Sequence, residues 1–119
     1  MYEIQLQIGY KLWLSNTKGD YVIGRGGADL LKAIDETHNI SKATELLANR
    51  LSYRKAWGML QKIKNHIGGL SPVETTSGGK GGGKTTLTPA GKQLLADYLE
   101  FEKIIDNACR KYQKKLEKK

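Results

Sequence analysis

Apolar and polar residues alternate along the first part of the chain. The apolar members of this pattern are Ile4, Leu6, Ile8, Tyr10, Leu12 and Leu14. A period of two is typical of a strand that buries one face. Residues 16–19 read as a turn, and residues 21–23 can return as a short antiparallel partner. The pattern therefore predicts an N-terminal β-hairpin over residues 2–23.

The hydrophobic period then changes to that of helices. The segment Gly24, Arg25, Gly26 and Gly27 interrupts the strand pattern. Apolar residues at helical spacing then predict a first helix over residues 28–38 that ends at Asn39. Ser41 is expected to cap a second helix over residues 41–48.

A third helix follows after a short turn. Asn49 is the residue best able to close the second helix in a left-handed conformation, and Ser52 is expected to cap a helix over residues 52–67. Two helices joined in this way predict a helix-turn-helix, whose second helix enters the major groove of DNA. An ordinary helical hairpin with a solvated basic face is an equally good interpretation of this stretch alone.

The exposed side of the third helix supplies the candidate DNA contacts. Tyr53, Arg54 and Lys55 form its first turn, the part of a recognition helix that meets base edges. The candidate DNA-binding residues of the helix-turn-helix are Ser41, Ser52, Tyr53, Arg54, Lys55, Gln61 and Lys62.

Two short β-branched segments flank a glycine-rich tip within residues 70–88, which predicts a second hairpin. Three helices followed by a hairpin make a winged helix, and Lys80 and Lys84 of the tip are expected to follow a phosphate backbone. The tip sequence GGKGGGKT also satisfies the phosphate-loop pattern. That motif must open a helix, whereas a strand-like run follows here, so nucleotide binding is the weaker interpretation.

Thr88 and Pro89 mark a strong helix start, and the helix is predicted over residues 89–117. Its apolar residues follow one another at spacings of three and four, the spacing of a two-helix seam. They predict a dimer interface made of Leu94, Tyr98, Phe101, Ile105, Ala108 and Tyr112. The alternative is a long helix folded back on its own domain.

Composition and charge fit this picture. The 119 residues carry a net charge of +8, which favours a polyanionic partner such as nucleic acid. The single cysteine, Cys109, and the absence of a signal or membrane-spanning pattern predict a soluble, cytoplasmic protein. No metal or cofactor site and no catalytic pair is evident in the sequence, so an enzyme is not expected.

The sequence resembles the DNA-binding domain of the molybdate-responsive regulator ModE over residues 10–101. The likeness is carried by YKLWL, LLKAIDETHNISKA, SYRKAW and VETTSGGKGGGKTTLTPAGKQLL. It implies an α+β winged helix-turn-helix over residues 1–88, a dimer through the terminal helix, and promoter binding. The turn before Ser52 is longer here than is usual in the family. The family's oxyanion-binding domains have no counterpart in this sequence, so no molybdate site is expected in it.

These observations predict a homodimeric, sequence-specific transcription regulator that binds double-stranded DNA. A non-specific architectural DNA-binding protein, whose affinity comes mainly from counterion release, is the alternative. A nucleotide-binding protein of the phosphate-loop type is a third, weaker one.

Overall fold

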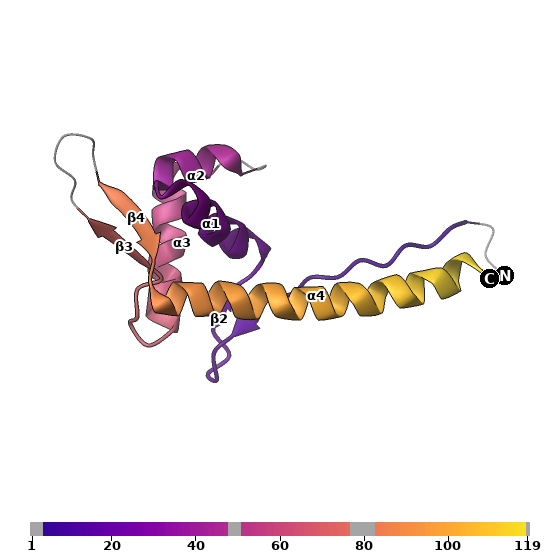
Figure 1. The fold of residues 1–119 in the computed structure, drawn as a ribbon. Coiled ribbons are helices and arrows are strands. Elements are labelled where there is room, and N and C mark those ends of the chain that lie inside the picture. The colour runs from indigo at the N-terminus through magenta and orange to yellow at the C-terminus, as the bar shows by residue number, and fades with distance from the viewer. Residues whose placement is uncertain (1–3, 48–50, 77–82, 119) are drawn as a thin grey trace.

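The computed structural model describes residues 4–47, 51–76 and 83–118. The elements follow in the order β1 (Leu14–Ser15), β2 (Tyr21–Ile23), α1 (Arg25–Thr37), α2 (Ile40–Leu46), α3 (Tyr53–His66), β3 (Val73–Thr76), β4 (Lys84–Leu87) and α4 (Pro89–Glu117). The α+β class is confirmed, and three helices, a hairpin and a long last helix are compatible with the predicted winged helix (Figure 1).

One hydrophobic core lies where the helices meet the start of α4. Leu30, Leu31 and Ile34 line the inner face of α1, and each is fully buried. Leu60 of α3 and Tyr98 of α4 belong to the same core. The rest of α4 extends away from it (Figure 1). This core fixes α3 and the hairpin β3–β4 relative to α4.

The N-terminal strand prediction is wrong over most of its length. Pairing is confined to β1 and β2, with Leu14 opposite Ile23 and Ser15 opposite Tyr21. Residues 4–13, which we term the arm, are not a strand but an extended segment beside α4 (Figure 1). The alternating pattern predicted an extended chain correctly, but this segment lies beside a helix instead of pairing with a returning strand. Its Ile4, Ile8 and Tyr10 remain exposed, so the predicted burial of one face is wrong for these residues.

Hydrogen bonds attach the arm to α4. The Ile8 amide donates to Oε1 of Gln113 at 3.0 Å, and Nε2 of Gln113 donates to the Leu6 carbonyl at 2.8 Å. The Tyr10 hydroxyl donates to the Asp106 carboxylate. One face of α4 thus supplies hydrogen-bond partners for backbone and side-chain groups of the arm. In a β-hairpin, a neighbouring strand would supply the partners of the backbone groups.

The first helix begins earlier than the sequence predicts, at Arg25 instead of residue 28. Gly27 lies inside α1 and is buried. A Cβ there would come 2.9 Å from Cγ1 of Ile23, closer than real Cβ contacts come. Gly27 therefore allows α1 to pack closely on β2, and it does not break the helix.

The caps between α1 and α2 also differ from the prediction. His38, with a φ of 56°, is the left-handed residue that ends α1. Asn39 caps α2, since its side chain accepts from the Lys42 amide at 2.8 Å. Ser41 lies one residue inside α2, so its prediction as a cap is wrong. Asn49, predicted to close α2, lies outside the described residues.

The caps of α3 and α4 agree with the sequence. The Ser52 hydroxyl accepts from the Lys55 amide at 3.1 Å, and the Thr88 hydroxyl accepts from the Gly91 amide at 3.1 Å. The Thr88 hydroxyl also donates to the Ser71 carbonyl at 2.6 Å. The start of α4 is therefore fixed against the segment that leads into β3.

Candidate nucleic-acid interface

Helix α3 has one buried face and one exposed face. Ala56, Leu60 and Ile63 are buried in the core. At about 100° per residue, the opposite side of the helix is formed by five other positions. They are Arg54, Gly58, Gln61, Lys62 and Asn65.

The charge of α3 has one sign. The helix contains Arg54, Lys55, Lys62 and Lys64 and no acidic residue. Among the residues that the structure describes, ion pairs involve only Arg25, which contacts Asp29 and Glu102. The basic side chains of α3 therefore have no acidic partner in the described part of the chain, which leaves them available to an anionic ligand.

The first turn of α3 is open to solvent. Tyr53, Arg54 and Lys55 are all exposed, with Tyr53 at 55% of its full surface. Tyr53 and Lys55 lie on opposite flanks of Arg54 because successive residues are rotated by about 100°. Ser52 differs from these, since its hydroxyl oxygen is engaged as the helix cap. The structure thus brings these predicted residues together at one end of one helix.

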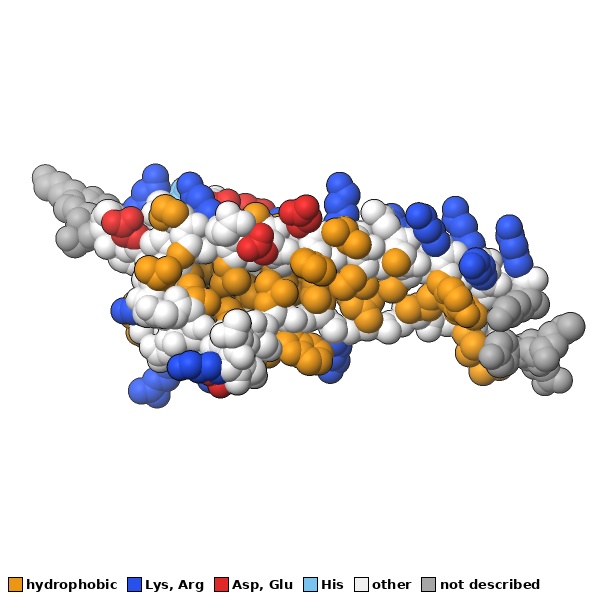
Figure 2. All heavy atoms as spheres, turned by 90° about the horizontal axis from the view of Figure 1, so that it is seen from below, with side chains coloured by type: hydrophobic (Ala, Val, Ile, Leu, Met, Phe, Trp, Pro, Cys, Tyr) orange, Lys and Arg blue, Asp and Glu red, His pale blue; other side chains and the backbone are white. Residues whose placement is uncertain are grey.

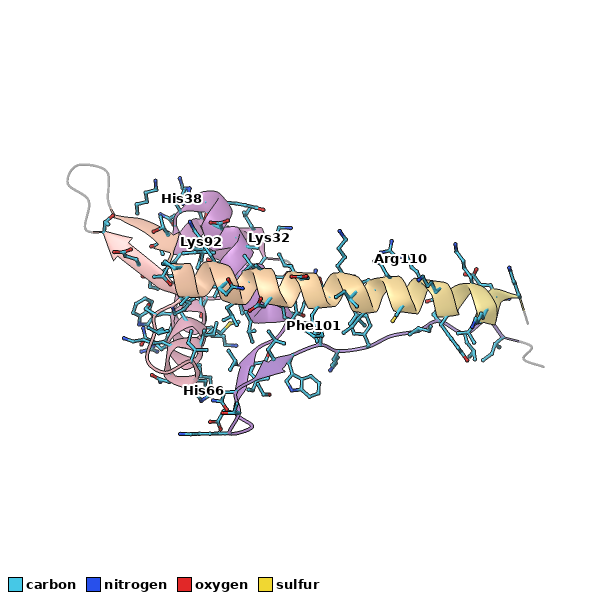
Figure 3. All side chains as sticks on the ribbon, turned by 60° about the horizontal axis from the view of Figure 1, so that its bottom comes forward. Lys32, His38, His66, Lys92, Phe101 and Arg110 are labelled. Carbon is cyan, nitrogen blue, oxygen red and sulfur yellow. The ribbon has the colours of Figure 1, made fainter. Side chains whose placement is uncertain are left out.

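The other end of α3 is held by the hairpin β1–β2. Nδ1 of His66 lies 2.7 Å from the Tyr21 carbonyl, and Nδ2 of Asn16 donates to the His66 carbonyl at 3.1 Å. Figure 3 shows His66 beside this hairpin. Its imidazole therefore fixes the helix end in place.

The hairpin β3–β4 forms the wing. Its strands pair with Val73 opposite Leu87 and Thr76 opposite Lys84. The Thr85 amide donates to the His38 carbonyl at 2.9 Å, which ties the wing to the end of α1. Lys84 is exposed at the outer end of β4, whereas Lys80 lies outside the described residues. Lys84 thus lies at the outer end of a hairpin that is fixed to the helices.

Ser41 and Lys42 occupy the exposed face of the first turn of α2. The Ser41 carbonyl accepts from the Thr44 hydroxyl at 2.7 Å. Because Asn39 is the cap, no cap bond engages the Ser41 hydroxyl. This keeps Ser41 among the candidate contacts.

Three residues of the exposed side of α3 are missing from the sequence-based candidates. Trp57 is 44% exposed and follows Tyr53 by one helical turn, so the two aromatic rings share a flank of α3. Gly58 and Asn65 follow Arg54 on the outward face. The spacing of four from Tyr53 is the signal that could have identified Trp57.

Helix α4 carries the predicted interface residues. Phe101, Tyr112 and Ala108 are exposed, and Leu94 and Ile105 are partly buried. Tyr98 is only 1% exposed, and its hydroxyl donates to the Leu12 carbonyl at 3.4 Å. Tyr98 therefore belongs to the core of its own chain and is left out of the interface considered below.

The glycine-rich tip does not lead into a helix. Lys84 and Thr85, the last two residues of the phosphate-loop pattern, belong to the strand β4. A phosphate loop needs a helix N-terminus at this place. Among the described residues, no group of three metal-ligating side chains occurs, and no helix is both long and apolar enough to cross a membrane.

Comparison with known proteins supports the resemblance. The chain is 42% identical over 74 residues to the molybdenum transport protein ModE of Herbaspirillum seropedicae, covering 62% of this chain and 26% of that protein. It is 39% identical over 88 residues to the molybdenum-pterin-binding protein MopB of Rhodobacter capsulatus, covering 73% and 31%. It is 38% identical over 69 residues to the transcriptional regulator ModE of Yersinia pestis, covering 58% and 25%.

The chain matches only about a quarter to a third of the length of these relatives. No family model matches it. The similarity to ModE and MopB confirms the resemblance that the sequence motifs indicate.

Proposed function

We propose that this chain is a ModE-like transcription regulator that binds double-stranded DNA as a homodimer, with α3 in the major groove. The exposed face of α3 carries the proposal. It combines a capped and exposed first turn with Arg54 and Lys62, and the helix as a whole has four basic residues and no acidic one. The name of the Yersinia pestis relative, a transcriptional regulator, points to the same function.

The residues of this face have different roles. Arg54 lies at the centre of the exposed first turn, and its guanidinium matches the two acceptors of a guanine edge. Tyr53 and Lys55 flank it and contact neighbouring bases or phosphates. Gln61 and Lys62 continue the contact along the groove.

The surrounding elements supply contacts to the DNA backbone. Ser41 of α2 reaches a phosphate, and Lys84 and Lys80 of the wing follow the backbone or enter the minor groove. Such contacts fix the position of the protein on DNA, whereas contacts to base edges select the sequence. Ser52 contributes to binding indirectly, because it caps the helix that carries the DNA contacts.

The dimer is formed by the apolar stripe of α4. Phe101 and Tyr112 each expose more than half of their surface. Exposed aromatic residues in one row on a helix are typical of a surface that another protein covers. Two chains supply two recognition helices, which bind two half-sites.

The test is a pair of variants that lose the same charge. Arg54→Ala removes the proposed base contact, and Lys103→Ala removes one charge from an exposed position of α4. On a preferred duplex, Arg54→Ala is expected to cost ~1–3 kcal/mol, or about 5- to 150-fold in affinity, and to relax sequence preference. Lys103→Ala is expected to change the affinity less than about threefold, since surface charges away from the contact act weakly.

Fluorescence anisotropy titrations with the preferred duplex and a scrambled one provide the readout. Equal losses for the two variants would refute the assignment of Arg54. Equal affinity of the wild-type chain for both duplexes would favour the architectural DNA-binding protein instead.

A further inference from the structure

Two exposed aromatic side chains of α3 lie outside the core and outside the proposed dimer interface. Figure 2 shows a band of hydrophobic side chains along the molecule, and the proposed dimer covers the exposed aromatic residues Phe101 and Tyr112 of α4. Tyr53 and Trp57 lie on α3 instead, and neither belongs to the hydrophobic core. Trp57 is nevertheless 44% exposed and borders the outward face of the helix. The two rings therefore form an apolar surface that the fold does not use.

Gly58 is the second feature of α3 that the fold does not explain. A glycine inside a helix is less favourable than an alanine, so a buried contact often accounts for it. Gly27 and Gly91 have such contacts, because a Cβ there would meet Ile23 or the backbone of Pro72. A Cβ built at Gly58 would meet nothing within 4 Å among the described residues, and the φ of Gly58 is not positive. The structure of the described chain therefore leaves room for a side chain that the sequence omits.

Trp57 and Gly58 border the same small hollow on the outward face of α3. On a helix surface, residues at positions i, i+3, i+4 and i+7 surround one hole between side chains. The residues at these positions are Arg54, Trp57, Gly58 and Gln61, and we term the hole between them the recess. Its two ends are polar, one side belongs to an aromatic residue, and the other side has no side chain. The recess therefore combines an apolar wall with room for a methyl-sized group.

A thymine base presents a group of this kind in the major groove of DNA. Its 5-methyl group projects into the groove, where apolar side chains contact it. Arginine matches the acceptors of guanine and glutamine matches adenine, so Arg54 and Gln61 suit neighbouring base pairs. These two residues are separated by ~10 Å along the helix, or about three base steps of ~3.4 Å. The recess between them is thus at the right place to meet an intervening base pair.

We propose that the recess binds the 5-methyl group of a thymine, in a base pair between those that Arg54 and Gln61 contact. The inference rests on the DNA binding of the proposed function and adds a determinant of its sequence specificity. Gly58 allows the base to approach the helix backbone closely, and the indole of Trp57 packs against the methyl group. Tyr53, one turn before Trp57, extends the apolar wall.

Replacement of thymine by deoxyuridine tests the proposal, because it removes the 5-methyl group and leaves base pairing unchanged. Each thymine of one half-site in the preferred duplex is replaced in turn, and the dissociation constant is measured by fluorescence anisotropy. At one of these thymines, deoxyuridine is expected to raise the dissociation constant of the wild-type chain about fourfold, the effect of losing one buried methyl group. This thymine is then used with the variants.

Two variants connect the lost methyl group to the recess. Gly58→Ala fills the recess with a methyl group of the protein, so it is expected to bind the deoxyuridine duplex at least as tightly as the thymine duplex. Trp57→Ala removes the apolar wall and is expected to bind both duplexes with equal affinity. Gly58→Ala is also expected to raise the midpoint of urea denaturation, so its weaker binding to the thymine duplex would not result from unfolding.

Two matched controls carry the same chemical changes outside α3. Gly26→Ala adds a methyl group at an exposed position of α1, where its Cβ would lie 3.6 Å from Cε of Met59, an ordinary contact. Trp13→Ala removes an indole that is 55% exposed on the arm. Both variants are expected to keep the fourfold preference for thymine, whatever their absolute affinity.

The opposite results overturn the inference. If deoxyuridine weakens binding at no thymine, or if the fourfold effect remains in Gly58→Ala or in Trp57→Ala, the recess does not bind a thymine methyl group. Arg54→Ala still tests the proposed function in that case, because its loss of affinity on the thymine duplex does not depend on the recess. If the wild-type chain prefers no duplex, sequence-specific binding is refuted together with the role of the recess.

Discussion

Gly91 has a packing role that a single methyl group tests. It is buried in the first turn of α4, directly against the backbone of Pro72. A Cβ at this position would lie 2.9 Å from the carbonyl carbon and 3.2 Å from Cα of Pro72, and closer still to the carbonyl oxygen. The same oxygen accepts from the Thr88 amide at 3.0 Å. Gly91→Ala therefore has to push α4 away from the segment that leads into β3.

The cost follows from the contacts that must move. Overpacking costs ~1–3 kcal/mol. The bonds from Thr88 to Pro72 and Ser71 are worth ~0.5–1.5 kcal/mol each when they are lost or stretched. Alanine's better helix propensity offsets at most ~1 kcal/mol. The variant is expected to lose about 2–4 kcal/mol of unfolding free energy, a large part of the stability of a small domain.

Urea denaturation monitored by circular dichroism measures this loss. Gly58→Ala is the matched control, because Gly58 also lies in a helix but a Cβ there would meet nothing within 4 Å. It is expected to stabilise the chain by up to ~1 kcal/mol. If Gly91→Ala were as stable as the wild-type chain, the close packing of α4 on Pro72 would be refuted.

Three further predictions concern the helix cap, the arm and the wing. Ser52→Ala removes the cap of α3 and should lower the unfolding free energy by ~1 kcal/mol in urea denaturation; no change would show that the cap is dispensable. The hydrogen bond to Asp106 raises the pKa of Tyr10 to about 12, so the contribution of this contact should persist below pH ~10 and disappear as the pH rises through about 12. An NMR titration of labelled tyrosine should show Asp106→Asn returning the pKa of Tyr10 toward 10.0, and an unchanged value would argue against the contact. Lys84→Ala should weaken binding to all duplexes alike and reduce the salt slope by about 1, whereas a loss confined to one sequence would argue against a backbone contact.

The starts of α3 and α4 were predictable because their signals are local. The caps at Ser52 and Thr88 satisfy amides only three residues away, so the sequence alone locates them. Helical spacing in α3 identified its buried face and therefore the exposed position of Arg54. The exposed first turn of α3, one part of the candidate interface, can therefore be located from local sequence patterns.

The surroundings of the arm and of the glycines were not predictable in this way. Alternation along residues 4–14 indicates an extended chain with one apolar face, but not whether a strand or a helix covers it. Gly27 reads as a helix breaker until its contact with Ile23 is known. The surroundings of the arm depend on residues that are distant in sequence, as does the hydrogen bond from the Tyr98 hydroxyl to the Leu12 carbonyl. Gly27 and Ile23 are close in sequence, but their contact depends on the way α1 packs on β2. Local patterns do not specify such contacts.

Sequence-specific DNA binding by a dimer is the central claim, and selection from a randomised duplex library tests it most directly. The chain is incubated with the library at ~150 mM salt, where non-specific contacts are weakened, and the retained duplexes are sequenced. The account predicts an inverted repeat whose half-sites are about one DNA turn apart. Retention of DNA without an enriched motif, or no retention at all, would contradict it.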